Sequence, residues 1–339
     1  VTVALIALVL ARAVDQTLYY RLANAVENYV WYIGALVLPI AFLAISVPVV
    51  IYKIYMTNDI TPEMRAFPMK RFALMGLLDT AYNLLSSWPI NGIGGTTANV
   101  LSQAALPMNM LLAAWFIGTR YTRTHYVGAA LVLYGILVQQ IPALQGDDTG
   151  GDASGITYVL WFVMMLASAL PNAASNVYKE IGLQAADLDI WYANVWIGVW
   201  QLIFGILTAP TVGLPFTPDH VKLSDLPKYL DHANSCFFGG NPTPEDHCRE
   251  YGLPLVIFAF FIVFNITYNM LMLSVFKNAS SVLFVLASAV RLPLVQLLLM
   301  WKFVAGGATQ TFTLHDGFAL FALVLGVCVY YSTPEIKPD

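Results

Sequence analysis

Stretches of about twenty apolar residues recur along the chain, and their length matches the thickness of a lipid bilayer. A helix needs about 20 residues to cross about 30 Å of hydrocarbon. None of the stretches alternates apolar and polar residues, as the strands of a membrane β-barrel do. The pattern predicts an all-α integral membrane protein with ten transmembrane helices. These lie near 1–22, 30–54, 72–88, 97–117, 126–141, 156–177, 190–209, 255–276, 282–304 and 318–331.

The composition agrees with a chain that faces lipid. Of the 339 residues, 58% are apolar and only 11% are charged. Soluble domains carry about 25% charged residues, so this chain has too few to cover a surface that faces water. The net charge of −4 and the lack of a basic patch argue against a nucleic-acid partner. The lipid bilayer is therefore the first partner that the sequence predicts.

Lys and Arg are divided unequally between the two sides of the predicted spans. With a cytoplasmic N-terminus, the cytoplasmic side holds nine of them, and the other side holds five, three of these in one long loop. Short cytoplasmic loops carry the excess of basic residues. We therefore expect both termini on the cytoplasmic side and loop 211–254 on the luminal side. Lys179 is counted as cytoplasmic, because the sixth span is expected to end at Val177.

The long loop 211–254, between the seventh and eighth spans, has two features of its own. Its apolar residues have the spacing of one helical face, which predicts a short helix on the membrane surface. These residues are Leu223, Leu226, Tyr229, Leu230 and Ala233. Cys236 and Cys248 follow, twelve residues apart. Disulfides persist on the non-cytoplasmic side of membranes, so we expect these cysteines to be bonded. Two free thiols in a mobile loop are the alternative.

The two halves of the chain share a sequence pattern. Ala81-Tyr-Asn-Leu-Leu matches Thr267-Tyr-Asn-Met-Leu 186 residues later, and Pro107 matches Pro293 at the same offset. Both prolines are expected to interrupt their helices at mid-depth. Residues 1–150 and 151–339, the latter with loop 211–254, are predicted to be two five-helix repeats. Because five is odd, the repeats must be inverted, and such repeats place the substrate site between them near the bilayer midplane.

Ionisable residues inside the spans are the main functional candidates, since each costs about 2.5–3.5 kcal/mol on insertion scales. Arg12 and Asp15 share one helical face, where they could bind substrate or form a neutralising structural pair. Asp79 has no partner within its own helix, so we expect it to couple transport to protons; a permanent pair with Arg291 is the alternative. The predicted substrate cavity is lined by Arg12, Asp15, Gln16, Asn83, Asn99, Gln103, Asn176, Glu180, Tyr268, Asn269 and Arg291.

Two acids and two arginines leave this cavity near neutral, which favours a small zwitterion over a simple cation. An amino acid, a short peptide or a γ-glutamyl thiol has that charge distribution. The sequence carries no HExxH, Walker, C-x-x-C or G-x-S-x-G motif, so neither an enzyme nor a cofactor is predicted. The five histidines show no metal-ligand spacing, and no metal site is expected.

Several motifs, in this order, resemble the chloroquine-resistance transporter family of the drug/metabolite transporter superfamily. They are Asn24-Ala-Val-Glu-Asn-Tyr, Leu78-Asp-Thr-Ala-Tyr-Asn, Val100-Leu-Ser-Gln-Ala-Ala-Leu-Pro-Met-Asn-Met, Ser175-Asn-Val-Tyr-Lys-Glu and Trp301-Lys-Phe-Val-Ala-Gly. The resemblance covers residues 11–332 and implies ten spans, inverted halves and a disulfide-bearing loop. It also implies a secondary transporter of a vacuolar, lysosome-like or plastid-envelope membrane, often coupled to protons. Substrates in such a family include amino acids, short peptides, glutathione-type thiols and weak-base drugs.

Three positions depart in charge from the malaria-parasite member of that family. Gln16 stands where that member has a lysine, Arg291 where it has a glutamine, and Tyr268 where it has an aspartate. Together they make the cavity less negative and argue against cationic drugs. We therefore expect a secondary active, proton-coupled transporter that exports or exchanges small zwitterionic solutes across an organelle membrane. A passive polyspecific channel and a non-transporting accessory subunit are the alternatives.

Overall fold

The computed structural model describes residues 2–26, 29–89, 93, 98, 101–145, 155–213, 221–243, 246–250, 252–306, 312 and 314–336, and these contain helices but no strand. The longer helices are α1 (Thr2–Val26), α3 (Leu38–Tyr55), α5 (Met69–Ser87), α8 (Ala105–Phe116), α9 (Arg123–Gln145), α10 (Gly155–Ala185), α11 (Ile190–Leu207), α12 (Leu226–Phe237), α13 (Pro254–Asn278), α14 (Ser281–Ala289), α15 (Arg291–Leu299) and α17 (Leu314–Tyr331). The shorter elements are α2 (Val30–Tyr32), η2 (Ile33–Val37), α4 (Pro62–Arg65), η3 (Ala209–Gly213), η4 (Leu223–Asp225) and α16 (Lys302–Ala305).

Among the described residues, seven helical segments are long and apolar enough to cross a membrane. They are Thr2–Val26, Val30–Tyr55, Gly155–Ala185, Ile190–Leu207, Pro254–Asn278, Ser281–Leu299 and Leu314–Tyr331. An all-α membrane protein is therefore supported. The other three predicted spans overlap α5, α8 and α9, where the described helix is shorter or carries more polar residues. The full set of ten spans stays a prediction.

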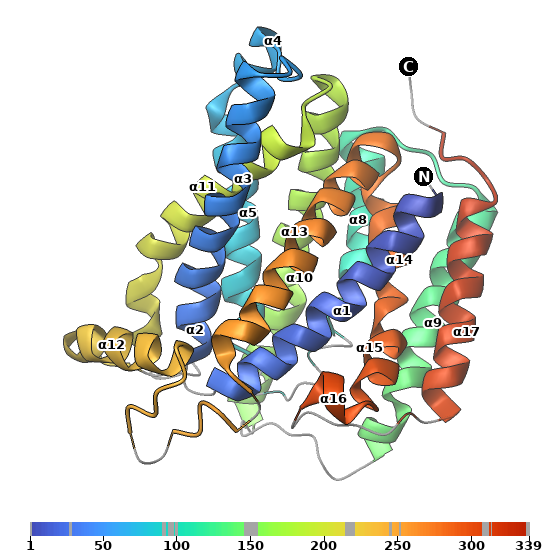
Figure 1. Cartoon of the computed structure of the whole chain (residues 1–339). Coiled ribbons are helices and arrows are strands. Elements are labelled where there is room, and N and C mark those ends of the chain that lie inside the picture. Colours follow the sequence, from blue (N-terminus) through green and yellow to red (C-terminus); the bar gives the residue numbers. More distant parts are fainter. Residues whose placement is uncertain are drawn as a thin grey trace.

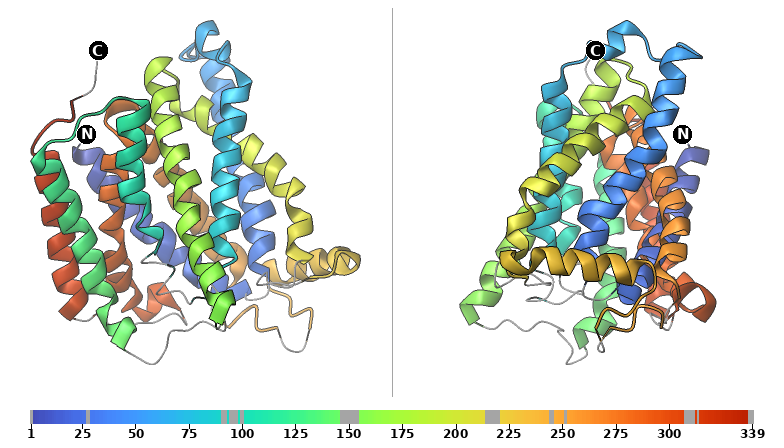
Figure 2. Two further views of the ribbon diagram at one scale, coloured as in Figure 1. Left: turned by 180° about the vertical axis from the view of Figure 1, so that it is seen from behind. Right: turned by 60° about the vertical axis from the view of Figure 1, so that its left-hand side comes forward.

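The helices stand side by side, and the chain crosses the bundle repeatedly (Figures 1 and 2). The start of α1 and the end of α17 lie at the same end, which we call the terminal end. Helix α12 lies across the opposite end, which we call the loop end. The predicted placement of the termini and the long loop at opposite ends is consistent with this arrangement, while the membrane side of each end stays a prediction.

Helices far apart in the sequence pack together. Helix α1 runs along α13, α5 packs against α10 and α11, and α9 runs along α17. The last contact is very close: a Cβ added to Gly128 on α9 would lie 2.7 Å from the carbonyl oxygen of Gly326 on α17. Only glycine fits that spacing without a shift of backbone. Helices α9 and α17 therefore form a tightly packed pair.

Helix α10 is longer than the sequence pattern suggests. Its 31 residues span about 46 Å at 1.5 Å per residue, more than the hydrocarbon thickness. The last turns pack against α13 and α14 instead of lipid. Lys179 lies inside the helix with only 4% of its surface exposed, so its expected place in a cytoplasmic connection is wrong.

The two matched prolines lie at equivalent places. Pro107 is the third residue of α8, and Pro293 is the third residue of α15. Proline lacks the N–H that would bond to the carbonyl four residues earlier, and in the ninth predicted span the helix is interrupted at Val290, between α14 and α15. The starts of α8 and α15 keep the 186-residue offset of the sequence match. The inverted relation of the two halves remains a prediction.

At the loop end, α12 begins at Leu226 and buries Tyr229 and Ala233; the side chain of Leu223 lies outside the described part. The predicted disulfide is confirmed, since Cys236 and Cys248 are bonded with their Cα atoms 5.4 Å apart.

A hydrogen bond ties the disulfide loop to the rest of the protein. The hydroxyl of Tyr29, which lies between α1 and α2, donates to Asp246 over 3.0 Å. Burial and this carboxylate raise the pKa of Tyr29, so the phenol stays protonated and keeps donating. The same carboxylate oxygen accepts from the hydroxyl of Thr243 over 2.6 Å.

Candidate functional site

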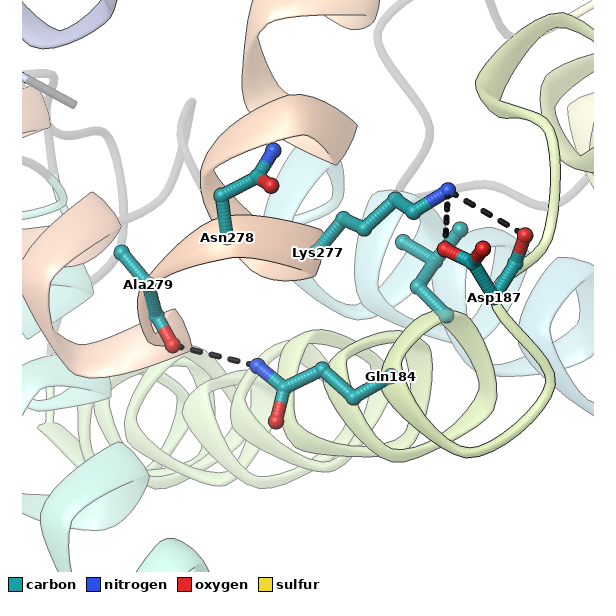
Figure 3. A pocket seen from close by; sticks show the side chains of 6 residues that line it. Gln184, Asp187, Lys277, Asn278 and Ala279 are labelled. Atoms are coloured by element: carbon teal, nitrogen blue, oxygen red, sulfur yellow. Dashed lines mark hydrogen bonds and ion pairs between the residues drawn. The ribbon is translucent and has the colours of Figure 1, made fainter.

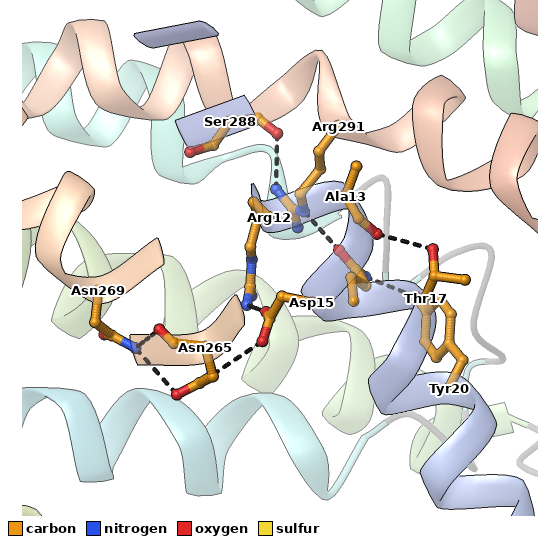
Figure 4. A network of polar contacts seen from close by, with 10 residues as sticks. Arg12, Ala13, Asp15, Thr17, Tyr20, Asn265, Asn269, Ser288 and Arg291 are labelled. Carbon is orange, nitrogen blue, oxygen red and sulfur yellow. Dashed lines mark hydrogen bonds and ion pairs between the residues drawn. The ribbon is translucent and has the colours of Figure 1, made fainter. Parts of the chain in front are cut away.

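Polar side chains from the middle of α1, the middle of α13 and the junction of α14 with α15 meet in one group (Figure 4). Helix α1 passes α13 and the α14–α15 junction at this point, and each of the three carries polar residues on the facing side. We call this group the central cluster. It consists of Arg12, Asp15, Gln16, Asn265, Tyr268, Asn269, Ser288 and Arg291.

One part of the central cluster is built around a buried carboxylate. Asp15, 1% exposed, forms an ion pair with Arg12 and accepts a hydrogen bond of 3.1 Å from Asn265. Asn269 in turn donates to the carbonyl of Asn265 over 2.8 Å. The Arg12 guanidinium lies over the Tyr268 ring, 4.4 Å from its centroid. The Arg12 side chain is 28% exposed, and a guanidinium has five N–H donors, so Arg12 can bind a second anion.

The other part is built around Arg291, which is bonded to neutral groups. Its Nε donates to Gln16 over 2.6 Å, and a terminal nitrogen donates to the carbonyl of Ser288 over 3.0 Å. Gln16 is itself fixed, because its amide donates to the Tyr20 hydroxyl over 2.7 Å. The Ser288 side chain is buried, and its hydroxyl has no hydrogen-bond partner among the described residues. A positive group and an unused hydroxyl therefore lie side by side.

Asp79 belongs to a second group, the Asp79 cluster, which consists of Asp79, Ser175, Lys179 and Gln201. The Lys179 ammonium lies 2.8 Å and 2.7 Å from the two carboxylate oxygens of Asp79. Ser175 donates to one of these oxygens, and Gln201 donates to the other over 2.6 Å. The sequence suggested an acid without a partner or one paired with Arg291. In the structure Asp79 is instead paired with Lys179.

This pair is largely withdrawn from water, with side-chain exposures of 5% for Lys179 and 16% for Asp79. Helices α5, α10 and α11 each contribute to it, so it also joins three helices. Each carboxylate oxygen of Asp79 already accepts two hydrogen bonds, so a proton that binds one of them must displace a donor from it. Protonation and helix packing are thereby linked at this point.

The remaining residues predicted to line the cavity lie outside the central cluster. Asn83 is exposed on α5, Gln103 precedes α8 and donates to Ser102 over 3.0 Å, and Asn176 on α10 is buried. Glu180, 1% exposed, accepts a hydrogen bond of 2.7 Å from the backbone N–H of Ser281 at the terminal end. Asn99 lies outside the described residues.

Comparison with known proteins gives the family. Residues 1–330 match the model of the chloroquine-resistance transporter-like (CRT-like) proteins. The chain belongs to the CRT-like family. It is 28% identical to Crt homolog 1 of Dictyostelium discoideum, covering 96% of this chain and 72% of that protein. It is 29% identical to the chloroquine resistance transporter of Toxoplasma gondii, over 88% of this chain and 34% of that one.

Two further comparisons bear on the fold and the membrane of this CRT-like chain. Protein CLT1, chloroplastic, of Arabidopsis thaliana is 28% identical over 84% of this chain and 63% of that protein. A solved crystal structure of a protein 18% identical in sequence superposes with a TM-score of 0.57, covering 95% of each chain; it supports the fold alone. Membership of the CRT-like family supports a transporter and a bilayer environment.

Sequence reasoning missed three members of the Asp79 cluster. The sequence predicts Lys179 in a cytoplasmic connection, and Ser175 carries no signal beyond the family motif in which both residues lie. Gln201 lies on α11, a largely apolar helix that also carries Asn194, and an amide in such a helix is a signal that points to a buried partner. The partner itself could not be identified, because it lies on another helix.

A separate hollow of about 390 Å³ lies between the ends of α10 and α13 in this CRT-like fold (Figure 3). Gln184 donates to the carbonyls of Phe276 and Ala279 over 2.8 and 3.1 Å. Lys277 pairs with Asp187 at 2.7 Å and donates to the carbonyl of Leu188. These contacts fasten the end of α13 to the end of α10. The hollow contains no residue of the central cluster.

Proposed function

We propose that the chain is a secondary active transporter that moves small zwitterionic solutes across an organelle membrane in exchange or symport with protons. Amino acids, short peptides and glutathione-type thiols are the solute class. The observation that carries the proposal is the central cluster, in which Arg12 and Asp15 of α1 meet Arg291 of α15 midway along the bundle. Charged groups at that depth are costly and serve function by default.

The cluster has complementary groups for both ends of a zwitterion. Arg12 and Arg291 supply guanidinium groups, which bind carboxylates with two parallel hydrogen bonds. Asn269 and the Ser288 hydroxyl supply oxygen acceptors for an ammonium group. Asp15 is already engaged by Arg12 and Asn265, so its charge balances Arg12. The remaining positive charge of Arg291 favours a solute with a carboxylate over a simple cation.

Proton coupling is proposed at Asp79, through its pair with Lys179. A proton on Asp79 cancels the carboxylate charge and releases Lys179, which loosens α5 from α10 and α11. Tyr82, three residues further along α5, lies near both Arg12 and Arg291. Movement of α5 therefore alters the surroundings of the central cluster, so that solute affinity follows the protonation of Asp79.

The membrane and its sidedness belong to the same proposal. The chloroplast location in the name of the Arabidopsis relative supports a plastid envelope, and a vacuolar or lysosome-like membrane is the other candidate. The terminal end is proposed to face the cytoplasm and loop 211–254 the lumen, on the distribution of basic residues.

Uptake of radiolabelled solutes into proteoliposomes tests the proposal. We expect saturable uptake that is accelerated by solute inside the vesicles and concentrated by a pH gradient. The variant Arg291→Gln should lose uptake, whereas Arg65→Gln, which changes an exposed arginine on α4, should not. Flux that neither saturates nor shows trans-stimulation would indicate a channel. No flux with any zwitterion of the panel would indicate an accessory subunit.

A further inference from the structure

Residues 332–336, directly after α17, fold back over the terminal end, and we call them the strap. The backbone N–H of Arg120 donates to the carbonyl of Ile336 over 2.8 Å, and the Thr124 hydroxyl donates to that of Thr333 over 2.9 Å. Nδ1 of His125 accepts from the N–H of Thr122, so Nε2 carries the proton and donates to the carbonyl of Thr333 over 3.0 Å. These bonds attach the strap to the start of α9.

The other side of the strap is attached to α14. One carboxylate oxygen of Glu335 accepts from the hydroxyls of Ser280 and Tyr330, each over 2.7 Å. Ser280 is the N-cap of α14, and its oxygen accepts from the N–H of Leu283 over 3.1 Å. Glu180 accepts from the next N–H, that of Ser281. Two carboxylates thus lie at the N-terminus of α14, where the helix dipole favours negative charge.

Helix α14 connects this end to the central cluster. Its nine residues are nearly all buried, and they extend about 13 Å at 1.5 Å per residue. Ser288 lies in the last turn of α14, and Arg291 begins α15. A shift at Ser280 is therefore carried along a short, packed helix to the residues that contact the proposed solute.

Most contacts of the strap join parts that are already packed together. Helices α9 and α17 are held by the glycine contact at Gly128, so bonds from the strap to α9 stay within one packed pair. The bond between Glu335 and Ser280 differs, because it crosses from this pair to α14. Glu335 is thus the strap side chain that holds the start of α14 against the α9–α17 pair.

We propose that the strap is a latch that closes the terminal end, and that the bond between Glu335 and Ser280 breaks when the protein opens there. The inference rests on the proposed transport function, which requires the ends of the protein to open in turn. It adds a device that the central cluster does not contain. Opening at this end is expected to move α14, and with it Arg291, away from Gln16.

Thiol labelling of the protein in lipid nanodiscs tests the latch, since both ends are accessible there. The reporter is Ser281→Cys in a Cys328→Ala background. Ser281 is fully buried, and its hydroxyl makes no hydrogen bond in the described part of the chain, so a thiol fits without loss of a contact. The disulfide of Cys236 and Cys248 stays intact. The rate of reaction with a membrane-impermeant maleimide reports exposure beneath the strap.

Glu335→Ala should increase the labelling rate about tenfold, the factor expected when a charge-assisted hydrogen bond is lost. Tyr330→Phe keeps the bond from Ser280 and should give a smaller increase. Glu63→Ala removes an exposed acid on α4 at the same end and should change nothing. If Glu335→Ala does not fold, Glu335→Gln, which keeps the side-chain shape, should still label faster than the control.

Equal labelling rates in the Glu335 variants and in Glu63→Ala would overturn the latch. This readout needs no transported solute, so the two proposals fail separately. Faster labelling without any uptake would leave the latch and remove the transport proposal. Unchanged labelling in a protein that still concentrates solute would remove the latch and leave the transport proposal.

Discussion

Replacing Asp79 by asparagine tests how strongly the buried pair with Lys179 holds the fold. The change removes the negative charge but leaves the ammonium of Lys179, whose side chain is 5% exposed, without a counter-ion. Removing one partner of a buried ion pair costs about 3–5 kcal/mol. Asp79 is 16% exposed, so some water reaches the pair, and we expect a loss near 3 kcal/mol. The new amide N–H groups also face the donors of Lys179 and Gln201, which adds to the cost.

Replacing Lys179 by methionine should cost less. Asp79 then keeps hydrogen bonds from Ser175 and Gln201, which compensate part of the buried carboxylate charge. The double variant Asp79→Asn with Lys179→Met removes both charges. Its loss should be smaller than the sum of the single losses, by a coupling of about 0.5–3 kcal/mol.

Reversible unfolding in mixed micelles measures the three free energies of unfolding, with Arg65→Gln as the control. Single losses that add up in the double variant would refute the pair as an energetic unit. Transport separates stability from coupling. If Asp79 carries the coupling proton, a double variant that folds should exchange solute but should not concentrate it in a pH gradient. Concentration by that variant would exclude Asp79 as the coupling site.

The other predictions concern packing, the disulfide and the central cluster. Gly128→Ala should destabilise the protein by about 1–3 kcal/mol through overpacking against α17, measured in the same micelles. Gly34→Ala is the control, because a Cβ added there meets nothing within 4 Å. Equal losses would argue against the close contact. Cys236→Ser with Cys248→Ser should cost about 2–4 kcal/mol and make the loop end cleavable by protease; unchanged proteolysis would contradict this. Arg291→Gln should weaken the binding of radiolabelled solute about tenfold or more, the effect of losing a charge-assisted hydrogen bond. Arg291→Lys should weaken it less, and equal binding by the unchanged protein and both variants would remove Arg291 from the site.

The positions of the helices could be predicted from sequence because hydrocarbon sets the length of each apolar stretch. Helix α11 was expected at 190–209 and is found at Ile190–Leu207. The same reasoning misplaced Lys179, since α10 continues past the apolar stretch and is covered there by α13 and α14. A helix that leaves the lipid but remains buried in protein gives no hydrophobic signal at its end.

The contents of the site were harder to predict than its helices. The pair of Arg12 with Asp15 could be predicted from the sequence, because both residues lie on one helix, three positions apart. Asp79 and Lys179 are 100 residues apart in sequence and lie on different helices, so no local pattern relates them. Glu180 follows Lys179 directly, yet it bonds to α14 at the terminal end. Adjacent residues on a helix point in different directions. The sequence alone therefore does not show that Lys179 and Glu180 belong to different polar groups.

The glycine contact between α9 and α17 has a consequence for biosynthesis. A ribosome makes α9 long before α17, and domains generally fold as the chain emerges. Helix α9 therefore enters the membrane with Gly128 facing no partner, and lipid or a chaperone must cover that face until α17 is inserted. The same delay applies to α1, which waits for α13. Assembly of this bundle is thus expected to finish only after α13 and α17 are inserted, and premature termination before α17 should yield a product that quality control removes.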